Sequence, residues 1–228
     1  MKVLFIGNSH TYMNDMPRLA GEMISRVTGS TCDVVALSYS GRSLKWHMEE
    51  EYFAVRFNIL HGGYDFCVMQ EVAHPMTDEG DTVRNAERII GLCRKAGTVP
   101  VIFETWAEKA KPYNQAEMTR RYRDLTQRTG ALLAPIGETW ERVMRDHLDI
   151  ELYWKDGEHA SPAGDYLAAL VITRTLTGKV PGTDLNEALD FSPEEGFQPV
   201  REDPEDERIT LPDGIIRAFH EALECRGG

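Results

Sequence analysis

Short apolar runs that end in polar turns recur along the first half of the chain. The first run ends at Ile6 and is followed by the residues Gly-Asn-Ser-His-Thr. A continuous apolar run of this length is typical of a strand that is covered on both faces of a parallel sheet. Comparable runs lie at residues 33–39, 64–69, 99–103 and 131–136. The pattern therefore predicts five buried strands.

Apolar residues at helical spacing separate these runs. The spacing predicts helices at residues 15–29, 44–60, 83–93, 118–125, 140–148 and 162–176. The connections are long enough for parallel pairing, because each contains a helix. The alternation predicts an α/β fold with three layers, α/β/α, built on a flavodoxin-like, doubly wound, parallel five-stranded sheet.

The composition of the chain changes after Gly178, where acidic residues and prolines become frequent. We expect residues 1–178 to form the α/β domain and residues 179–228 to form an acidic C-terminal extension, punctuated by several prolines over 186–207. The periodicity of residues 215–223 predicts a terminal amphipathic helix that packs on the domain or on a partner subunit. The extension is expected to serve as a lid or as a dimer arm, and the sequence favours neither.

Composition and charge exclude several classes of partner. The chain has 228 residues, and 42% of them are hydrophobic, which is ordinary for a globular protein. A net charge of -12 argues against a nucleic-acid surface. The apolar runs are too short for a membrane span or a secretory signal, so we expect a cytoplasmic protein without membrane association. The four cysteines form no C-x-x-C pair, and neither they nor the histidines have metal-ligand spacing, so no metal and no cofactor are expected.

A candidate nucleophile follows the first strand. In a parallel sheet, binding sites lie beyond the carboxyl ends of the strands, which is where Ser9 is placed. A polar loop farther along the chain supplies Asp156 and His159. Ester hydrolysis needs a hydroxyl nucleophile, an imidazole that takes its proton and a carboxylate that orients the imidazole. These three residues would fill those roles, although Ser9 alone is equally typical of a structural turn.

The negative oxygen that develops during ester hydrolysis needs hydrogen-bond donors. Candidates are the backbone N–H groups of Ser9 and Gly41 and the side-chain amide of Gln70, each at the end of a predicted strand. A glycine at position 41 would let the backbone approach a substrate closely, because it has no Cβ.

The same residues resemble the conserved blocks of the SGNH hydrolases, also called the GDSL esterase/lipase superfamily. Gly7 to Thr11 resembles the block that carries the nucleophile, and Gly41 is similar to the glycine of the oxyanion hole. Asp156-Gly157-Glu158-His159 is similar to the final Asp-x-x-His block. The resemblance covers residues 1–177 and implies an α/β/α hydrolase that works through an acyl-enzyme.

Two departures from the family pattern mark this chain as a divergent member. Asn8 stands where the first block usually has aspartate, and Gln70-Glu71 stands where the third block usually reads Gly-x-Asn-Asp. Glutamine retains the amide N–H donor on a longer side chain, so the direction of this donor depends on the position of the backbone. The departure puts the assignment of Gln70 in question more than that of Ser9.

Four further residues follow strand ends and are candidates for lining the substrate cleft: His10, Glu71, His74 and Trp106. Tryptophan faces can stack on a sugar ring or cover an acyl pocket, although core packing is their commoner use. A structural role is equally open for the two histidines.

The sequence thus predicts a serine esterase that hydrolyses short acyl or carbohydrate-linked acetyl esters through an acyl-enzyme, with a small-molecule ester as its partner. A non-catalytic carbohydrate-binding module on the same fold and an acyltransferase remain open. A nucleotide binder is disfavoured, because the first turn lacks the glycine spacing of phosphate-binding loops. A homodimer is compatible with the terminal helix.

Overall fold

Strand β1 lies inside a single parallel sheet and is paired on both edges. The computed structural model describes residues 1–74, 77–183 and 210–224. The strands follow the order β2-β1-β3-β4-β5 and are β1 (Lys2–Gly7), β2 (Asp33–Ser38), β3 (Phe66–Gln70), β4 (Val99–Phe103) and β5 (Leu132–Ala134). This arrangement confirms the expected doubly wound, five-stranded sheet.

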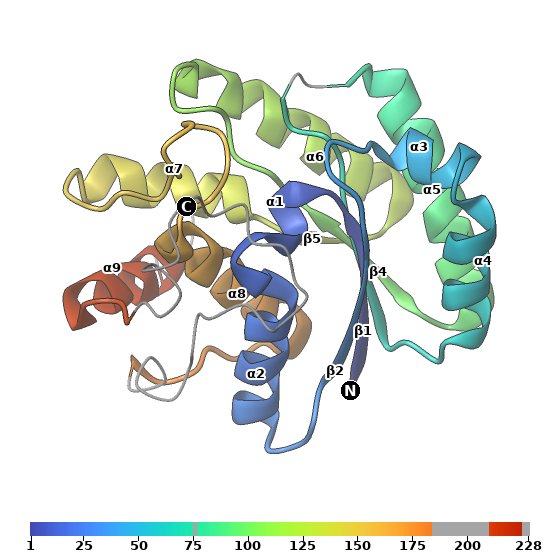
Figure 1. Ribbon diagram of the computed structural model, residues 1–228, viewed down its shortest axis with the longest axis horizontal. Helices are drawn as coiled ribbons and strands as arrows, with labels where there is room; N and C mark the ends of the chain where they lie inside the picture. Colours follow the sequence, from blue (N-terminus) through green and yellow to red (C-terminus); the bar gives the residue numbers. More distant parts are fainter. Residues whose placement is uncertain (75–76, 184–209, 225–228) are drawn as a thin grey trace.

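Helices cover both faces of the sheet (Figure 1). One face is covered by α2 (Met16–Thr28), α7 (Ile136–Asp146) and α8 (Pro162–Thr177). The other is covered by α3 (Leu44–Glu49), α4 (Tyr52–His61), α5 (Glu79–Ala96) and α6 (Gln115–Thr129). Short turns form α1 (Ser9–Tyr12), η1 (Met13–Asp15) and η2 (Pro112–Asn114).

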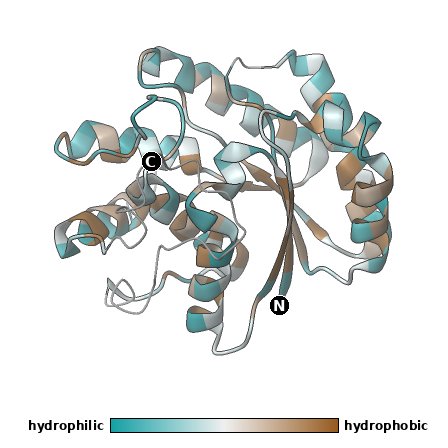
Figure 2. Ribbon diagram, viewed as in Figure 1, coloured by the Kyte–Doolittle hydropathy of each residue, from teal (hydrophilic) through white to brown (hydrophobic). Residues whose placement is uncertain are grey.

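Alternating side chains of β1 serve the two hydrophobic cores. Val3 and Phe5 pack under α2 and α8, whereas Leu4 and Ile6 pack under α3, α4 and α5, and all four side chains are fully buried. This two-sided burial explains the continuous apolar run in the sequence, and Figure 2 shows the sheet as a hydrophobic layer between the helices. Cys32, which packs at the edge of the first core, is also buried.

The terminal helix α9 (Asp213–Glu224) packs on the domain itself. Ile216 and Phe219 are fully buried in the same core as α7 and α8. Arg142 of α7 and Arg174 of α8 donate hydrogen bonds to the carbonyl oxygens of Ala222 and Leu223, the last turn of α9. Cations at this end of a helix also favour its dipole. Most of the acidic extension, residues 184–209 and 225–228, lies outside the described residues.

Local structure differs from the sequence prediction in three places. Residues 44–60 form two helices rather than one, because the chain turns at residues 50 and 51 between α3 and α4. Residues 12–14, which were expected to form a loop, lie instead in α1 and η1, and Asn14 has a left-handed conformation at φ +49°. The fifth strand is only three residues long, because α7 begins at Ile136.

Candidate active site

Residues 7–11, which carry the candidate nucleophile Ser9, are called the nucleophile turn. The side chain of Asn8 stabilises this turn, and the turn leaves no room for a side chain at Gly7. Asn8 caps α1, and its Oδ1 accepts the backbone N–H of His10 at 3.0 Å. A Cβ on Gly7 would lie 2.3 Å from Oγ1 of Thr11, which explains the glycine. Ser9 is therefore the first helical residue after the carboxyl end of β1, and its side chain is largely buried.

The loop before α8 carries the acid and the base in one tight turn. Oδ1 of Asp156 accepts the backbone N–H groups of Glu158 and His159 at 2.9 and 3.0 Å. Gly157 has φ +74°, a conformation that favours glycine. The backbone N–H of Trp154 donates to the carbonyl oxygen of His159 at 2.8 Å and closes the loop. The three-residue spacing of the Asp-x-x-His block follows from this turn.

A continuous chain of hydrogen bonds joins the three sequence-predicted catalytic residues. Oδ2 of Asp156 lies 2.7 Å from Nδ1 of His159, and Nε2 of His159 lies 2.8 Å from Oγ of Ser9. Burial would raise the pKa of Asp156, but its hydrogen bonds from Glu158 and His159 outweigh this and lower the pKa. An ionised carboxylate holds the proton on Nδ1, which leaves Nε2 free to accept the proton of Ser9.

The segment after β2 brings Gly41 into a defined turn. Gly41 has φ +66°, and no atom lies within 4 Å of where its Cβ would be. The glycine is thus explained by its backbone conformation, whereas the sequence argument invoked close contact. Nδ2 of Asn8 donates to the carbonyl oxygen of Arg42 at 3.1 Å and ties this turn to the nucleophile turn. Within the described residues, neither the N–H of Ser9 nor that of Gly41 donates a hydrogen bond.

Asn8 makes contacts at the candidate site that the sequence reasoning did not anticipate. The contact with the carbonyl oxygen of Arg42 requires an N–H donor on the side chain of residue 8. The asparagine amide supplies this donor, whereas an ionised aspartate has none. The family's usual aspartate would place two acceptors together here. The available signal was Asn8 itself, which is a favoured helix cap directly before the nucleophile.

Gln70 lies beneath the nucleophile turn with its amide directed elsewhere. Oε1 of Gln70 accepts the backbone N–H of Asn8 at 3.0 Å and the hydroxyl of Thr11 at 2.9 Å. The backbone N–H can only donate, so this contact fixes which end of the amide is the oxygen. Nε2 of Gln70 then donates to the carbonyl oxygen of Glu71. In this conformation Gln70 supports the turn, and one of the two N–H groups of its amide donates to Glu71.

The ring of His10 lies beside that of His159, and the ring of His74 packs against His10. The ring of His10 is 4.8 Å from that of His159 and 5.3 Å from that of His74, measured between centroids. Burial, together with the neighbouring His159 and His74, lowers the pKa of His10 to about 3. Burial also lowers the pKa of His74. Both imidazoles are therefore neutral at ordinary pH and add no charge that would oppose protonation of His159.

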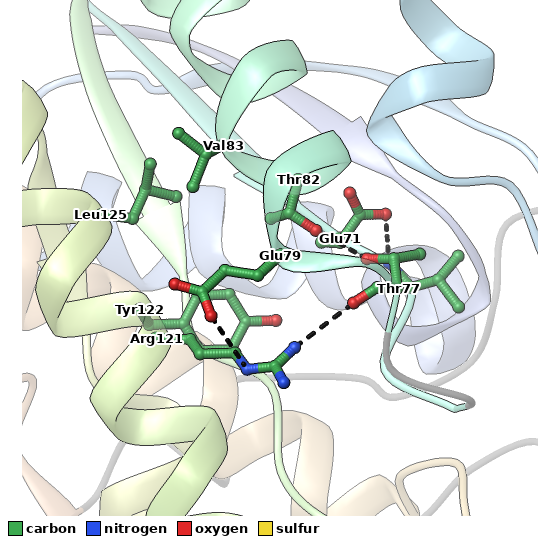
Figure 3. Close-up of a pocket in the computed structure, with 9 residues that line it drawn as sticks. Glu71, Thr77, Glu79, Thr82, Val83, Arg121, Tyr122 and Leu125 are labelled. Carbon is green, nitrogen blue, oxygen red and sulfur yellow. Dashed lines mark hydrogen bonds and ion pairs between the residues drawn. The ribbon is translucent and has the colours of Figure 1, made fainter.

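Glu71 faces a different pocket from Ser9. The pocket is lined by Thr82 and Tyr122, among others, and includes neither Ser9 nor His159 (Figure 3). Oε1 of Glu71 accepts the N–H of Leu44 at 3.1 Å, at the start of α3. Burial raises the pKa of this carboxyl, partly offset by its hydrogen bonds. Glu71 therefore stabilises the segment after Gly41 through its hydrogen bond with Leu44. Because its side chain lines a pocket without Ser9 or His159, the structure does not place Glu71 as a substrate-lining residue.

Trp106 is a core residue that also supports the catalytic loop. Its side chain is fully buried and stacks on Trp140, with ring centroids 4.2 Å apart. Its Nε1 donates to the carbonyl oxygen of Glu158 at 2.8 Å. The expectation that Trp106 lines the cleft is therefore corrected, because no face of the ring is open to a ligand.

Metal-ligating side chains do not gather in the part of the chain that the structure describes, where no group of three or more suited to a metal is found. Nor is any helix over residues 1–74, 77–183 and 210–224 both long and apolar enough to cross a membrane.

Comparison with known proteins places the fold. No family model matches the chain, and none of the curated proteins matches it. Among solved structures, a DUF4886 family protein from Bacteroides uniformis is similar, with TM-score 0.65 and 17% identity, over 98% of this chain and 94% of that chain. A G-D-S-L family protein from Desulfitobacterium hafniense gives a TM-score of 0.60 at 13% identity, over 76% of this chain and 98% of its own.

The acetyl-xylooligosaccharide esterase Axe2 from Geobacillus, solved as a mutant, is similar to 79% of this chain over 96% of its own length, with TM-score 0.59 and 13% identity. This chain has the three-layer fold of the GDSL, or SGNH, hydrolases, as the sequence resemblance predicts. At these identities the comparisons establish the fold alone.

Proposed function

We propose that this chain is a serine ester hydrolase in which Ser9 attacks the ester carbonyl carbon, His159 moves the proton and Asp156 orients the imidazole. The observation that carries the proposal is the unbroken hydrogen-bonded chain from Oγ of Ser9 to Oδ2 of Asp156. Ser9 and the pair Asp156 and His159 are distant from each other in sequence, and they meet at the carboxyl edge of the sheet in the order that acyl transfer requires. The GDSL fold supports the same class of reaction.

The geometry suits a two-step reaction. Nε2 of His159 takes the hydroxyl proton as Oγ of Ser9 bonds to the carbonyl carbon, and the resulting imidazolium gives that proton to the leaving alcohol. Water then attacks the acyl-enzyme, transfers a proton to His159 and releases the acid with Ser9 restored. The N–H groups of Ser9 and Gly41, which donate to no described residue, are the donors we assign to the oxyanion.

For the substrate we propose a small ester, with a short acyl group or an acetyl group carried by a sugar. Solved proteins of this fold include the acetyl-xylooligosaccharide esterase Axe2, and that likeness is the support for a sugar ester. The buried position of Trp106 excludes this tryptophan as a stacking face for a sugar. A cytoplasmic location stays an expectation from the sequence.

A non-catalytic binding module is the alternative from another class. The position of Gln70 would favour it, because one N–H of this expected oxyanion donor is already used on the carbonyl oxygen of Glu71. The intact contact between Ser9 and His159 weighs against it, since a binding module has no need of an oriented imidazole on a serine hydroxyl. An acyltransferase would use the same residues and differ only in what intercepts the acyl-enzyme.

The direct test is turnover of p-nitrophenyl acetate, longer p-nitrophenyl esters and acetylated xylo-oligosaccharides. Ser9→Ala and His159→Ala are expected to lose about a thousandfold or more in kcat/KM. Ser30→Ala, at an exposed serine between α2 and the start of β2, is the matched control and should keep wild-type rates. The proposal fails if the wild type hydrolyses none of these esters, or if Ser9→Ala turns them over as fast as the wild type.

A further inference from the structure

Asn14 and Asp15 join α1 to α2 in a backbone conformation that is uncommon for residues other than glycine. Their φ angles are +49° and +54°, both in the left-handed region. Asparagine and aspartate tolerate this region better than most residues, but it is less favourable for them than the right-handed helical region. Both residues are only 5% exposed. A buried, strained turn of this kind persists where the surrounding contacts hold it in place.

The side chain of Asn14 contacts the segment that carries His159. Its Nδ2 donates to the carbonyl oxygen of Ala160 at 3.2 Å and to Oδ2 of Asp165 at 2.6 Å. Ala160 directly follows His159, and Asp165 is a buried residue in the first turn of α8. A backbone carbonyl can only accept, so the contact with Ala160 fixes which end of the amide is the nitrogen.

Asn14 lies on the same short segment as the nucleophile turn. Ser9 begins α1, and Asn14 follows a few residues later in η1. Helix α2, which continues from η1, packs along α8, which continues from the loop of His159 (Figure 1). The contacts of Asn14 therefore join these two segments close to the points where Ser9 and His159 extend from them.

We propose that Asn14 is a positioning residue, which holds the carbonyl oxygen of Ala160 and thereby keeps Nε2 of His159 within reach of the nucleophile. The inference rests on the proposed esterase function. A misplacement of about 1 Å between reacting groups can cost on the order of a hundredfold in rate. Because Asn14 acts through the backbone of Ala160 and not on the substrate, its loss should lower kcat and spare KM.

Asn14→Gly removes the amide but permits the left-handed backbone, since glycine adopts positive φ readily. We expect kcat for p-nitrophenyl acetate to fall about tenfold or more, with KM within about threefold of the wild type. Asn14→Asp, which has almost the same shape but no N–H to donate, is the second variant and should show a similar loss. The matched control is Asp15→Gly, at a residue of the same conformation and burial whose carboxylate pairs with Arg18. It should leave kcat unchanged.

A double-mutant cycle separates positioning from a general effect on the fold. The measured quantity is the rate at which a fluorophosphonate labels Ser9, with and without Asn14→Gly, in the wild type and in His159→Ala. Because Asn14 acts through His159, Asn14→Gly should lower this rate about tenfold or more in the wild type and change it little in His159→Ala. An equal factor in both backgrounds would overturn the proposal.

The remaining outcomes distinguish this inference from the proposed function. An active wild type whose kcat is unchanged in Asn14→Gly and Asn14→Asp would overturn the role of Asn14 and leave the esterase proposal intact. A wild type that hydrolyses no ester would overturn both. Circular dichroism reports folding, and if neither Asn14 variant folds where Asp15→Gly does, Asn14 is a structural residue and the proposal is wrong.

Discussion

The side-chain oxygen of Gln70 lies 3.0 Å from the backbone nitrogen of Asn8, so the third-block residue supports the nucleophile turn from below. The same oxygen also accepts the hydroxyl of Thr11. Gln70 is almost fully buried, and its two partners would have no other acceptor at hand if the side chain were removed. The position is therefore one where a loss of structure and a loss of catalysis can be separated by measurement.

Gln70→Ala is expected to lower the free energy of unfolding by roughly 2–3 kcal/mol, because it leaves two buried donors unpaired. Under conditions where the variant is folded, kcat should stay within about tenfold of the wild type, since the donors that we assign to the oxyanion are backbone groups. Urea unfolding and ester turnover measure the two effects. A fall in kcat of a hundredfold or more in folded protein would show instead that Gln70 donates to the oxyanion.

Asn8→Asp tests the contact between the two turns of the site. The carboxylate keeps the cap on His10 but loses the hydrogen bond to the carbonyl of Arg42, and it sets two acceptors against each other. We expect kcat to fall about tenfold with little change in KM, because the Gly41 donor shifts relative to the reacting carbon.

The control for Asn8→Asp is Asn85→Asp on α5, which also removes a side-chain amide that donates to a backbone carbonyl, at a buried site distant from Ser9. It should change stability without changing kcat. If the two variants lower kcat equally, Asn8 has no special part in positioning the donors.

The fold and the hydrogen-bonded arrangement of Ser9, His159 and Asp156 could be predicted from the sequence because each depends on a local pattern. The apolar run of β1 is continuous since both of its faces are buried, and the turn at Asp156 needs only three residues to place acid and base together. The placement of Gln70 and Trp106 was not accessible. Each depends on a backbone group from another segment. Gln70 accepts a hydrogen bond from the N–H of Asn8, and Trp106 donates one to the carbonyl oxygen of Glu158.

Glu104 provides a test of how burial shapes the response to pH. Its carboxyl, directly after β4, is fully buried, and burial raises its pKa to about 8. The hydrogen bonds from Thr119 and Gln115 act in the opposite direction and lower the pKa. Between pH values of about 4.5 and about 8, the folded protein holds a proton that the unfolded chain has released. The stability that comes from this group is therefore fully present at low pH and is lost as the pH rises through that window.

Glu104→Gln cannot ionise, so its stability relative to the wild type should increase as the pH rises, by roughly 4 kcal/mol between about pH 5 and about pH 9. Urea unfolding of both proteins at the two pH values measures this difference. The exposed Glu50→Gln serves as the control and should show no such trend. A Glu104→Gln difference that is independent of pH would mean that the carboxyl is ionised in the folded protein.

Covalent labelling of the wild type with a fluorophosphonate tests the central claim most directly, because the reagent reacts only with a serine whose proton a neighbouring base can take. Intact mass and peptide mapping should show one adduct per chain, located on Ser9, and no adduct on Ser9→Ala. His159→Ala should label far more slowly than the wild type. An unlabelled wild type, or an adduct on another residue that persists in Ser9→Ala, would contradict the assignment of Ser9 as an activated nucleophile.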